Sequence, residues 1–227
     1  TLTTNQLLPV SFGEAGARFC IGRYYGTVEM SCVSMSRIGG SQSIDFTALS
    51  ALCSRIVAHS ALRILSLAHN QIAGVDSVGG GERKAQGVDE LLTVLRSGVC
   101  MLEELDLSGN LFSTADAHAL LHAALTPSVR GGVVAQHLKL NTWLIPVQLL
   151  AAGSTAALGL AASSIGAADA QLLATTIRER SSLQPTIVDL SSNPLGGEGA
   201  LAIVKALADR RVPLEQLRLV NVGLRAE

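Results

Sequence analysis

The feature that most constrains the fold of this chain is the stretch LEELDLSGNLF at residues 102–112. It follows the spacing L-x-x-L-x-L-x-x-N. Leu105 and Leu107 alternate as residues of a short strand do, so both point to one face. Asn110 follows where the chain must turn, and its amide can donate to and accept from backbone groups that would otherwise be buried and unpaired. Since one such unit cannot bury its apolar edge alone, the pattern predicts neighbouring units elsewhere in the chain.

The same spacing recurs along the whole chain. It is closest at 62–74, 102–112 and 185–207, looser at 155–177 and 214–224, and loosest at 28–40 and 135–145. A fragment of it opens the chain at Leu2. The first leucine positions fall at 30, 62, 102, 135, 155, 185 and 214, an average step of about 31 residues. With the opening fragment, the pattern predicts eight strands.

Between these strands, apolar residues at helical spacing predict helices. The expected helices are Phe12 to Tyr25, Ile44 to Ala58, Ala85 to Arg96, Ala115 to Leu125, Ala168 to Arg180 and Gly197 to Asp209. The step from 135 to 155 is too short for a full helix, so Pro146 to Ala152 is expected to form a single turn or a short helix. The three glycines at 79–81 precede a charge cluster and predict a surface loop, because the G-x-x-x-x-G-K-[ST] phosphate-loop pattern is absent.

The steps near 29 residues and the segments NPLGGEGALAIVKAL and SSIGAADAQLLATTI resemble the ribonuclease-inhibitor-like class of leucine-rich repeats. The resemblance implies an α/β fold: a right-handed solenoid, or horseshoe, with parallel strands on the concave face and helices on the convex face. We expect residues 1–227 to form a single domain of about eight irregular repeats. Because the chain begins and ends inside a repeat, we expect it to be a piece of a longer chain.

Composition excludes several classes of function. Apolar residues make up 48% of the chain, aromatic residues only 3%, and the net charge is −1. No basic stripe is present, which argues against nucleic acid as a partner. The four cysteines are far apart in the sequence and form no C-x-x-C motif, so neither a disulfide framework nor a zinc site is indicated. This favours a reducing, cytoplasmic compartment. Residues 140–168 lack charge but contain Asn141 and Pro146 and are rich in alanine, so buried repeats are favoured over insertion into a membrane.

Polar strand residues between the leucines are the candidate binding residues. The resemblance implies that they face the concave surface, where this class commonly holds protein partners. The candidates are Arg63, Ser66, His69, Glu103, Glu104, Asp106, His137, Lys139, Asp189 and Arg218. Glu103, Glu104 and Asp106 form the most acidic strip and predict a partner with basic residues. The helical convex face and the edges are the alternative binding surfaces.

Catalytic and metal-binding patterns are not apparent in the sequence. It contains no G-x-S-x-G, no H-E-x-x-H and no glycine-rich nucleotide turn, so no cofactor is expected. His118 and His122 share one helix face, but no third ligand follows at a suitable spacing, so we expect ordinary helix residues and no metal. Trp143 stands where the turn asparagine is expected, and we expect it to fill space in the core rather than to be exposed.

These observations favour a non-enzymatic module that binds or scaffolds a protein. One alternative is a regulator of a GTPase or the sensor part of a NOD-like receptor. Another is a structural subunit of a large cytoskeletal or organellar assembly. Flanking sequence would separate the receptor from the others, because a nucleotide-binding domain would precede the repeats.

Overall fold

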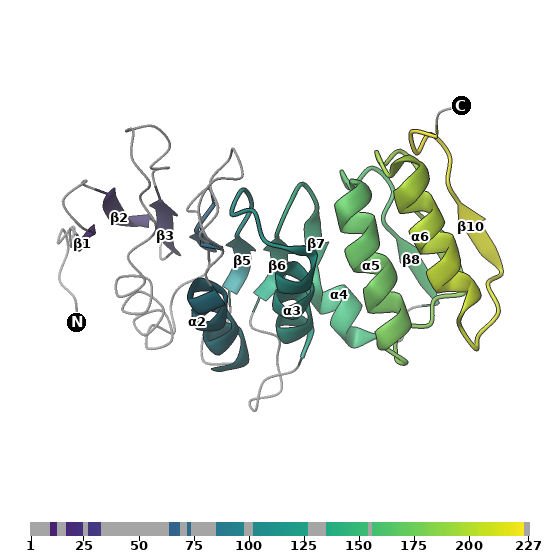
Figure 1. Cartoon of the computed structure of the whole chain (residues 1–227), viewed down its shortest axis with the longest axis horizontal. Helices are drawn as coiled ribbons and strands as arrows, with labels where there is room; N and C mark the ends of the chain where they lie inside the picture. Colours follow the sequence, from purple (N-terminus) through teal and green to yellow (C-terminus); the bar gives the residue numbers. More distant parts are fainter. Residues whose placement is uncertain are drawn as a thin grey trace. The chain divides into compact units, whose positions relative to one another are not determined.

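The computed structural model (Figure 1) describes residues 10–12, 17–24, 27–32, 64–68, 72–73, 85–97, 102–126, 135–153 and 156–224. The chain divides into two compact units, Thr1–Leu140 and Asn141–Glu227. The single domain expected over residues 1–227 stays a prediction. The expected helix from Ile44 to Ala58, the loop at 79–81 and the fragment at Leu2 lie outside the described residues.

The first unit alternates strands and helices. Its strands are β1 (Val10–Phe12), β2 (Ala17–Tyr24), β3 (Thr27–Cys32), β4 (Ile64–Ser66), β5 (Leu102–Asp106) and β6 (Ala135–Lys139), and its helices are α2 (Ala85–Ser97) and α3 (Thr114–Leu125). These six strands lie in chain order in one sheet. The pairs β3–β4, β4–β5 and β5–β6 are parallel, as expected. Leu65, Leu105 and Leu138 lie in register on neighbouring strands and are buried, which stacks the repeat leucines into a core.

The start of the chain does not follow the repeat pattern. A helix was expected from Phe12 to Tyr25, and this is wrong: β1, β2 and β3 form an antiparallel meander. Tyr24 pairs with Thr27, so only two residues connect β2 and β3, a connection length typical of hairpins. The spacing of Ala15 and Phe19 suits a helix, but ARFCIGRY also alternates and contains aromatic and β-branched residues that favour strands. The expectation of parallel strands throughout is therefore wrong for the pairs β1–β2 and β2–β3, which are antiparallel.

The second unit has the same alternation. Its strands are β7 (Leu144–Pro146), β8 (Ala157–Gly159), β9 (Ile187–Asp189) and β10 (Gln216–Arg218), and its helices are α4 (Val147–Ala152), α5 (Ala167–Glu179) and α6 (Gly196–Ala208). β8, β9 and β10 are consecutive parallel strands, and β10 lies at the edge of their sheet. Figure 1 shows α5 and α6 side by side, in agreement with their close packing.

The helices expected from Ala85, Ala115, Ala168 and Gly197 are confirmed within one residue at each end, and the short helix is confirmed as α4. Two strands differ from the expected pattern. β3 begins at Thr27, before the first leucine position expected at residue 30, and β7 was not expected. β7 has only three residues, LIP, which is too short to show a period.

The turn asparagines join successive repeats, which confirms the role expected for Asn110. Its Nδ2 donates to the carbonyl oxygens of Leu107 (2.8 Å) and Leu67 (2.9 Å), and its Oδ1 accepts from the amide of Ile72 at 3.2 Å. Each bond to the preceding repeat satisfies a backbone group that is shut off from water. The asparagine thus fixes one repeat on the next.

Asn193 makes the same set of bonds in the second unit. Its Nδ2 donates to the carbonyl oxygens of Leu190 (2.9 Å) and Leu160 (2.7 Å). Its Oδ1 accepts from the backbone amides of Ser163 (2.9 Å) and Ile165 (3.0 Å) in the preceding repeat. The repeat with Ser163 has no asparagine at the equivalent position, so the amides of Ser163 and Ile165 donate to Asn193 of the next repeat instead.

The repeat that lacks an asparagine at position 143 has a different connection. Trp143 is 1% exposed, which confirms that it fills the core. Asp169, at the start of α5, accepts from Asn141 Nδ2 at 3.0 Å and from Thr142 Oγ1 at 2.9 Å. Thr142 Oγ1 also lies 3.0 Å from the carbonyl oxygen of Ser164. A buried carboxylate therefore ties this turn to the next repeat where an asparagine does not.

One position of the turn has a left-handed backbone in four repeats. Gly109 (φ 71°), Ala162 (φ 53°), Ser192 (φ 57°) and Asn221 (φ 56°) each lie two residues after the last strand leucine. Glycine adopts this conformation without strain and asparagine tolerates it, whereas alanine does not. Ala162 therefore stores strain at this turn.

We expect Ala162→Gly to raise the free energy of unfolding of the second unit by about 1 kcal/mol, because relief of the left-handed strain exceeds the entropy that glycine loses on folding. The measurement is urea unfolding followed by the fluorescence of the single tryptophan, Trp143. The matched control is Ala161→Gly at the neighbouring exposed position, which is not left-handed and should lower stability. A loss of stability in both variants would contradict the prediction.

Candidate functional site

In the first unit, the strand register brings several predicted residues into rows. Ser66 pairs with Asp106 and Asp106 with Lys139 on three neighbouring strands. Glu104 lies beside His137 in the adjacent row. Because residues two apart in a strand share a face, these five side chains lie on the same face of the sheet, opposite the buried leucines. We name the residues Ser66, Glu104, Asp106, His137 and Lys139 the polar strand face.

Asp106 is held in place by two partners. Its Oδ1 accepts from the backbone amide of Ser108 at 2.9 Å and from its hydroxyl at 2.7 Å. Its Oδ2 lies 3.8 Å from Lys139 Nζ on the next strand. A partly exposed ion pair of this kind adds little to stability, about 0–1 kcal/mol. It does place one carboxylate and one ammonium group in fixed positions and reduces the net negative charge of the strip.

The second unit repeats this arrangement. Asp189 Oδ1 accepts from the backbone amide of Ser191 at 3.0 Å, and Asp189 Oδ2 lies 3.7 Å from Arg218 Nη1 on the next strand. Asp189 is in register with Arg218 on one side and with Gly159 on the other. The recurring sequence D-L-S-x-N thus carries an aspartate that is oriented by its own serine and paired with a basic residue one repeat later.

The hydrogen bonds from the backbone and hydroxyl of Ser191 hold the pKa of Asp189 below its usual value, and Arg218 adds to this effect. Both interactions favour the charged carboxylate. Because the pKa is lower in the folded state, the resulting stabilisation is complete above the pKa of the unfolded chain. It is lost as the pH falls through the folded-state pKa.

We therefore expect the stability of the second unit to fall less steeply in Asp189→Asn than in the wild type between about pH 5 and about pH 2. Unfolding in urea at a series of pH values measures these slopes. Ser191→Ala is the control: it removes the hydroxyl but keeps the backbone amide, so its slope should lie between the other two. Equal slopes for wild type and Asp189→Asn would refute the assignment.

One of the predicted site residues, Glu103, is not on these rows. Glu103 has the same strand parity as the buried Leu105 and Leu107, so alternation separates it from Glu104 and Asp106. Arg63 and His69 lie outside the described residues.

His118 and His122 lie on α3 with their ring centroids 6.4 Å apart. Among the residues that the structure describes, no group of three or more His, Cys, Asp or Glu side chains gathers to hold a metal ion. Across the same residues, no helix is long and apolar enough to cross a membrane.

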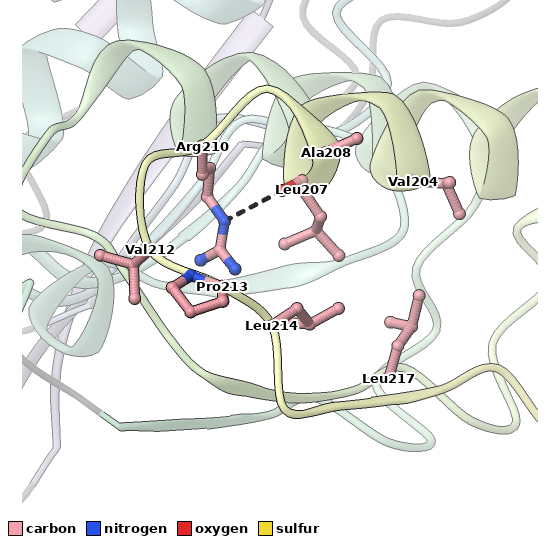
Figure 2. A pocket seen from close by; sticks show the side chains of 8 residues that line it. All are labelled: Val204, Leu207, Ala208, Arg210, Val212, Pro213, Leu214 and Leu217. Atoms are coloured by element: carbon pink, nitrogen blue, oxygen red, sulfur yellow. Dashed lines mark hydrogen bonds between the residues drawn. The ribbon is translucent and has the colours of Figure 1, made fainter.

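Sequence reasoning missed a groove of about 310 Å³ in the second unit. Figure 2 shows Val204 and Leu207 of α6 on one side and Leu214 on the other, with Arg210 beside Pro213. Arg210 Nη1 donates to the carbonyl oxygen of Pro185 at 2.7 Å, and Arg210 Nη2 is buried without a hydrogen-bond partner among the described residues. Burial lowers the pKa of Arg210.

The outer face of α6 beside this groove is apolar. Leu201 is 53% exposed and Val204 41% exposed. The signal was present in GGEGALAIVKALA, where Leu201 and Val204 lie outside the buried stripe that contains Ala200, Ile203 and Leu207.

Comparison with known families agrees with the fold and the turn geometry. A leucine-rich repeat model matches residues 101–122, and a second leucine-rich repeat model matches residues 186–204. These segments contain the two asparagines, Asn110 and Asn193, whose hydrogen bonds join successive repeats. The matches support a leucine-rich repeat protein, with strands and helices that alternate as such repeats require. The comparison with curated proteins found no match.

Proposed function

We propose that this chain is a non-enzymatic interaction module that binds a protein partner through the polar strand face. Leucine-rich repeats commonly serve as protein-interaction modules. The observation that carries the proposal is the register of β4, β5 and β6, which places Ser66, Glu104, Asp106, His137 and Lys139 on one face of the sheet. The buried leucines Leu65, Leu105 and Leu138 lie on the opposite face of the same strands. The polar side chains named above therefore gather on the face that the leucines do not occupy.

The parallel register of neighbouring strands supports the ribonuclease-inhibitor-like solenoid, with the polar strand face on its concave side. The D-L-S-x-N sequence recurs in both units, and each copy orients its aspartate in the same way. This recurrence supports a binding surface built from equivalent positions of successive repeats. The widely separated cysteines favour the cytoplasm as its compartment.

The acidic strip of Glu103, Glu104 and Asp106 predicts a partner with several basic residues. Because Asp106 is paired with Lys139, fewer basic residues are needed on that partner. A partner needs a basic group to meet Glu104, and polar groups rather than further basic ones to meet the Asp106–Lys139 pair. A charged contact at the rim of an interface mainly affects the rate of association, whereas a desolvated one affects dissociation. We propose that Glu104 makes the main charged contact.

The test is affinity purification with the whole chain as bait, followed by cross-linking of captured proteins. We expect Glu104→Arg to reduce capture of the partner at least about tenfold, because it opposes like charges at the contact. Asp89→Arg makes the same kind of charge change at an exposed position of α2 and should leave capture unchanged. Equal capture by wild type and Glu104→Arg would overturn the polar strand face as the binding site.

A further inference from the structure

The exposed side of α6 has the pattern of a helix that packs against another helix. Gly197, Leu201, Val204 and Ala208 are all exposed. Their spacings of four, three and four residues are those of the a and d positions of a coiled-coil seam. We name these four residues the α6 seam. An apolar stripe at this spacing on the surface marks an interaction site rather than a solvated face.

The preceding repeat shows that this seam is not the ordinary surface of a repeat helix. Leu158 pairs with Val188, so equivalent residues of the two repeats differ by 188 − 158 = 30 positions. Leu201 therefore corresponds to Gln171, and Ala208 corresponds to Arg178, and both of these α5 residues are exposed and polar. α6 packs on α5 and still leaves Gln171 exposed. Val204 corresponds to Ala174, which is 1% exposed, so a further repeat stacked in the same way would cover Val204 but leave Leu201 exposed. An occupant that covers both Leu201 and Val204 has to approach differently from a further repeat.

The charges beside the seam indicate which occupant fits. Glu198 and Lys205 are seven residues apart, so both lie on the same flank of the seam, and both are exposed. When two copies of a helix pack antiparallel about a twofold axis, this flank of one helix lies beside the same flank of the other. Glu198 of each copy then faces Lys205 of its partner copy, which gives two opposite-charge contacts.

The same axis also matches the apolar residues. Antiparallel packing places Leu201 of one copy against Val204 of the second copy, and Gly197 against Ala208. The large residues form the central layers, and the small ones allow close approach at the ends. A twofold interface requires such self-complementarity, because every contact occurs twice. The groove adjoins the seam at Val204 and Ala208, as Figure 2 shows. A second copy packed on the seam would therefore cover that side of the groove as well.

We propose that this protein forms a twofold dimer in which the α6 seams of two copies pack antiparallel. The polar strand face is not part of this interface and remains available for a different partner. Dimerisation would present two such faces in one particle, which raises the overall affinity for a partner with repeated sites.

Sedimentation equilibrium of the whole chain tests the proposal. We expect the wild type to be a reversible dimer. We expect Leu201→Gln with Val204→Ala to be a monomer, because it gives α6 the residues that α5 carries at Gln171 and Ala174. Since these residues are compatible with a repeat helix, circular dichroism should show an unchanged fold. A wild type that stays monomeric up to its solubility limit, or a dimer that survives this double substitution, would overturn the proposal.

Charge reversal tests the antiparallel register. Glu198→Lys should raise the dissociation constant of the dimer about tenfold, because it places like charges together twice. Adding Lys205→Glu to Glu198→Lys should restore the wild-type constant, since both pairs become opposite again. Asp89→Lys on α2 is the matched control and should have no effect. Failure of the charge swap to restore dimerisation would refute the antiparallel arrangement.

Discussion

Replacing Trp143 with alanine should lower the free energy of unfolding of the second unit by about 3–5 kcal/mol, the range for truncating a buried aromatic side chain. The indole is 1% exposed and stands at the turn position that asparagine holds in the regular repeats. Only 3% of the chain is aromatic, so the core is built mainly from leucine, alanine, valine and isoleucine. Removal of the indole leaves a cavity in this core. Urea unfolding followed by far-UV circular dichroism measures the loss, since the variant has no tryptophan to report by fluorescence.

Two further variants separate the contribution of volume from that of polarity. The indole Nε1 is buried without a hydrogen-bond partner among the described residues, which costs stability. Trp143→Phe keeps much of the volume and removes this group, so we expect a smaller loss, about 1–2 kcal/mol. Leu144→Ala, at a neighbouring side chain that is 42% exposed, should change stability by less than about 0.5 kcal/mol. A loss in Trp143→Ala no larger than in Leu144→Ala would refute the core role of the indole.

Asn193→Ala should lower the free energy of unfolding of the same unit by about 3 kcal/mol or more. The side chain satisfies the amides of Ser163 and Ile165 and the carbonyls of Leu160 and Leu190. Each buried backbone group left without a partner costs about 1–3 kcal/mol, although relaxation and water recover part of this. Urea unfolding followed by Trp143 fluorescence measures the change.

Asn193→Asp distinguishes hydrogen bonding from packing in this test. Aspartate has nearly the same volume, but above its pKa it can only accept, so it places a carboxylate against two carbonyl oxygens. We therefore expect a loss comparable to that of Asn193→Ala at neutral pH. Gln171→Ala, on the exposed side of α5, should have little effect. If Asn193→Asp left the free energy of unfolding unchanged, the asparagine would matter for its volume alone.

These predictions depend on features that the sequence indicated to different degrees. Asn110 was predicted as the turn residue from the spacing L-x-x-L-x-L-x-x-N, and its hydrogen bonds confirm that role. Trp143 was predicted to fill space in the core of the irregular repeat rather than to be exposed, and its burial confirms this. The hydrogen bonds from Asn141 and Thr142 to Asp169 were not predicted. They join residues 27 and 28 positions apart, so no local pattern shows them.

The first strands show where periodicity fails. Residues 17–24 satisfy both helical and strand spacing over a short window, and the helix prediction was wrong because tertiary pairing of β2 with β1 and β3 decided the outcome. The candidate site shows a different limit. Sequence reasoning chose Asp106, Lys139, Asp189 and Arg218 as site residues but did not predict that they pair across strands. The pairing depends on register, and register is set by contacts between repeats.

The sequence by itself determined the repeat, the positions of its leucines and turn asparagines, and most helix boundaries, because these follow from local spacing and from the need to satisfy buried backbone groups. Only the tertiary structure decided which charges lie side by side and which apolar residues remain uncovered. Leu201 and Val204 look like core residues in the sequence, yet they are exposed on α6. Burial depends on what packs against a helix face, and the sequence of the helix alone does not contain that information.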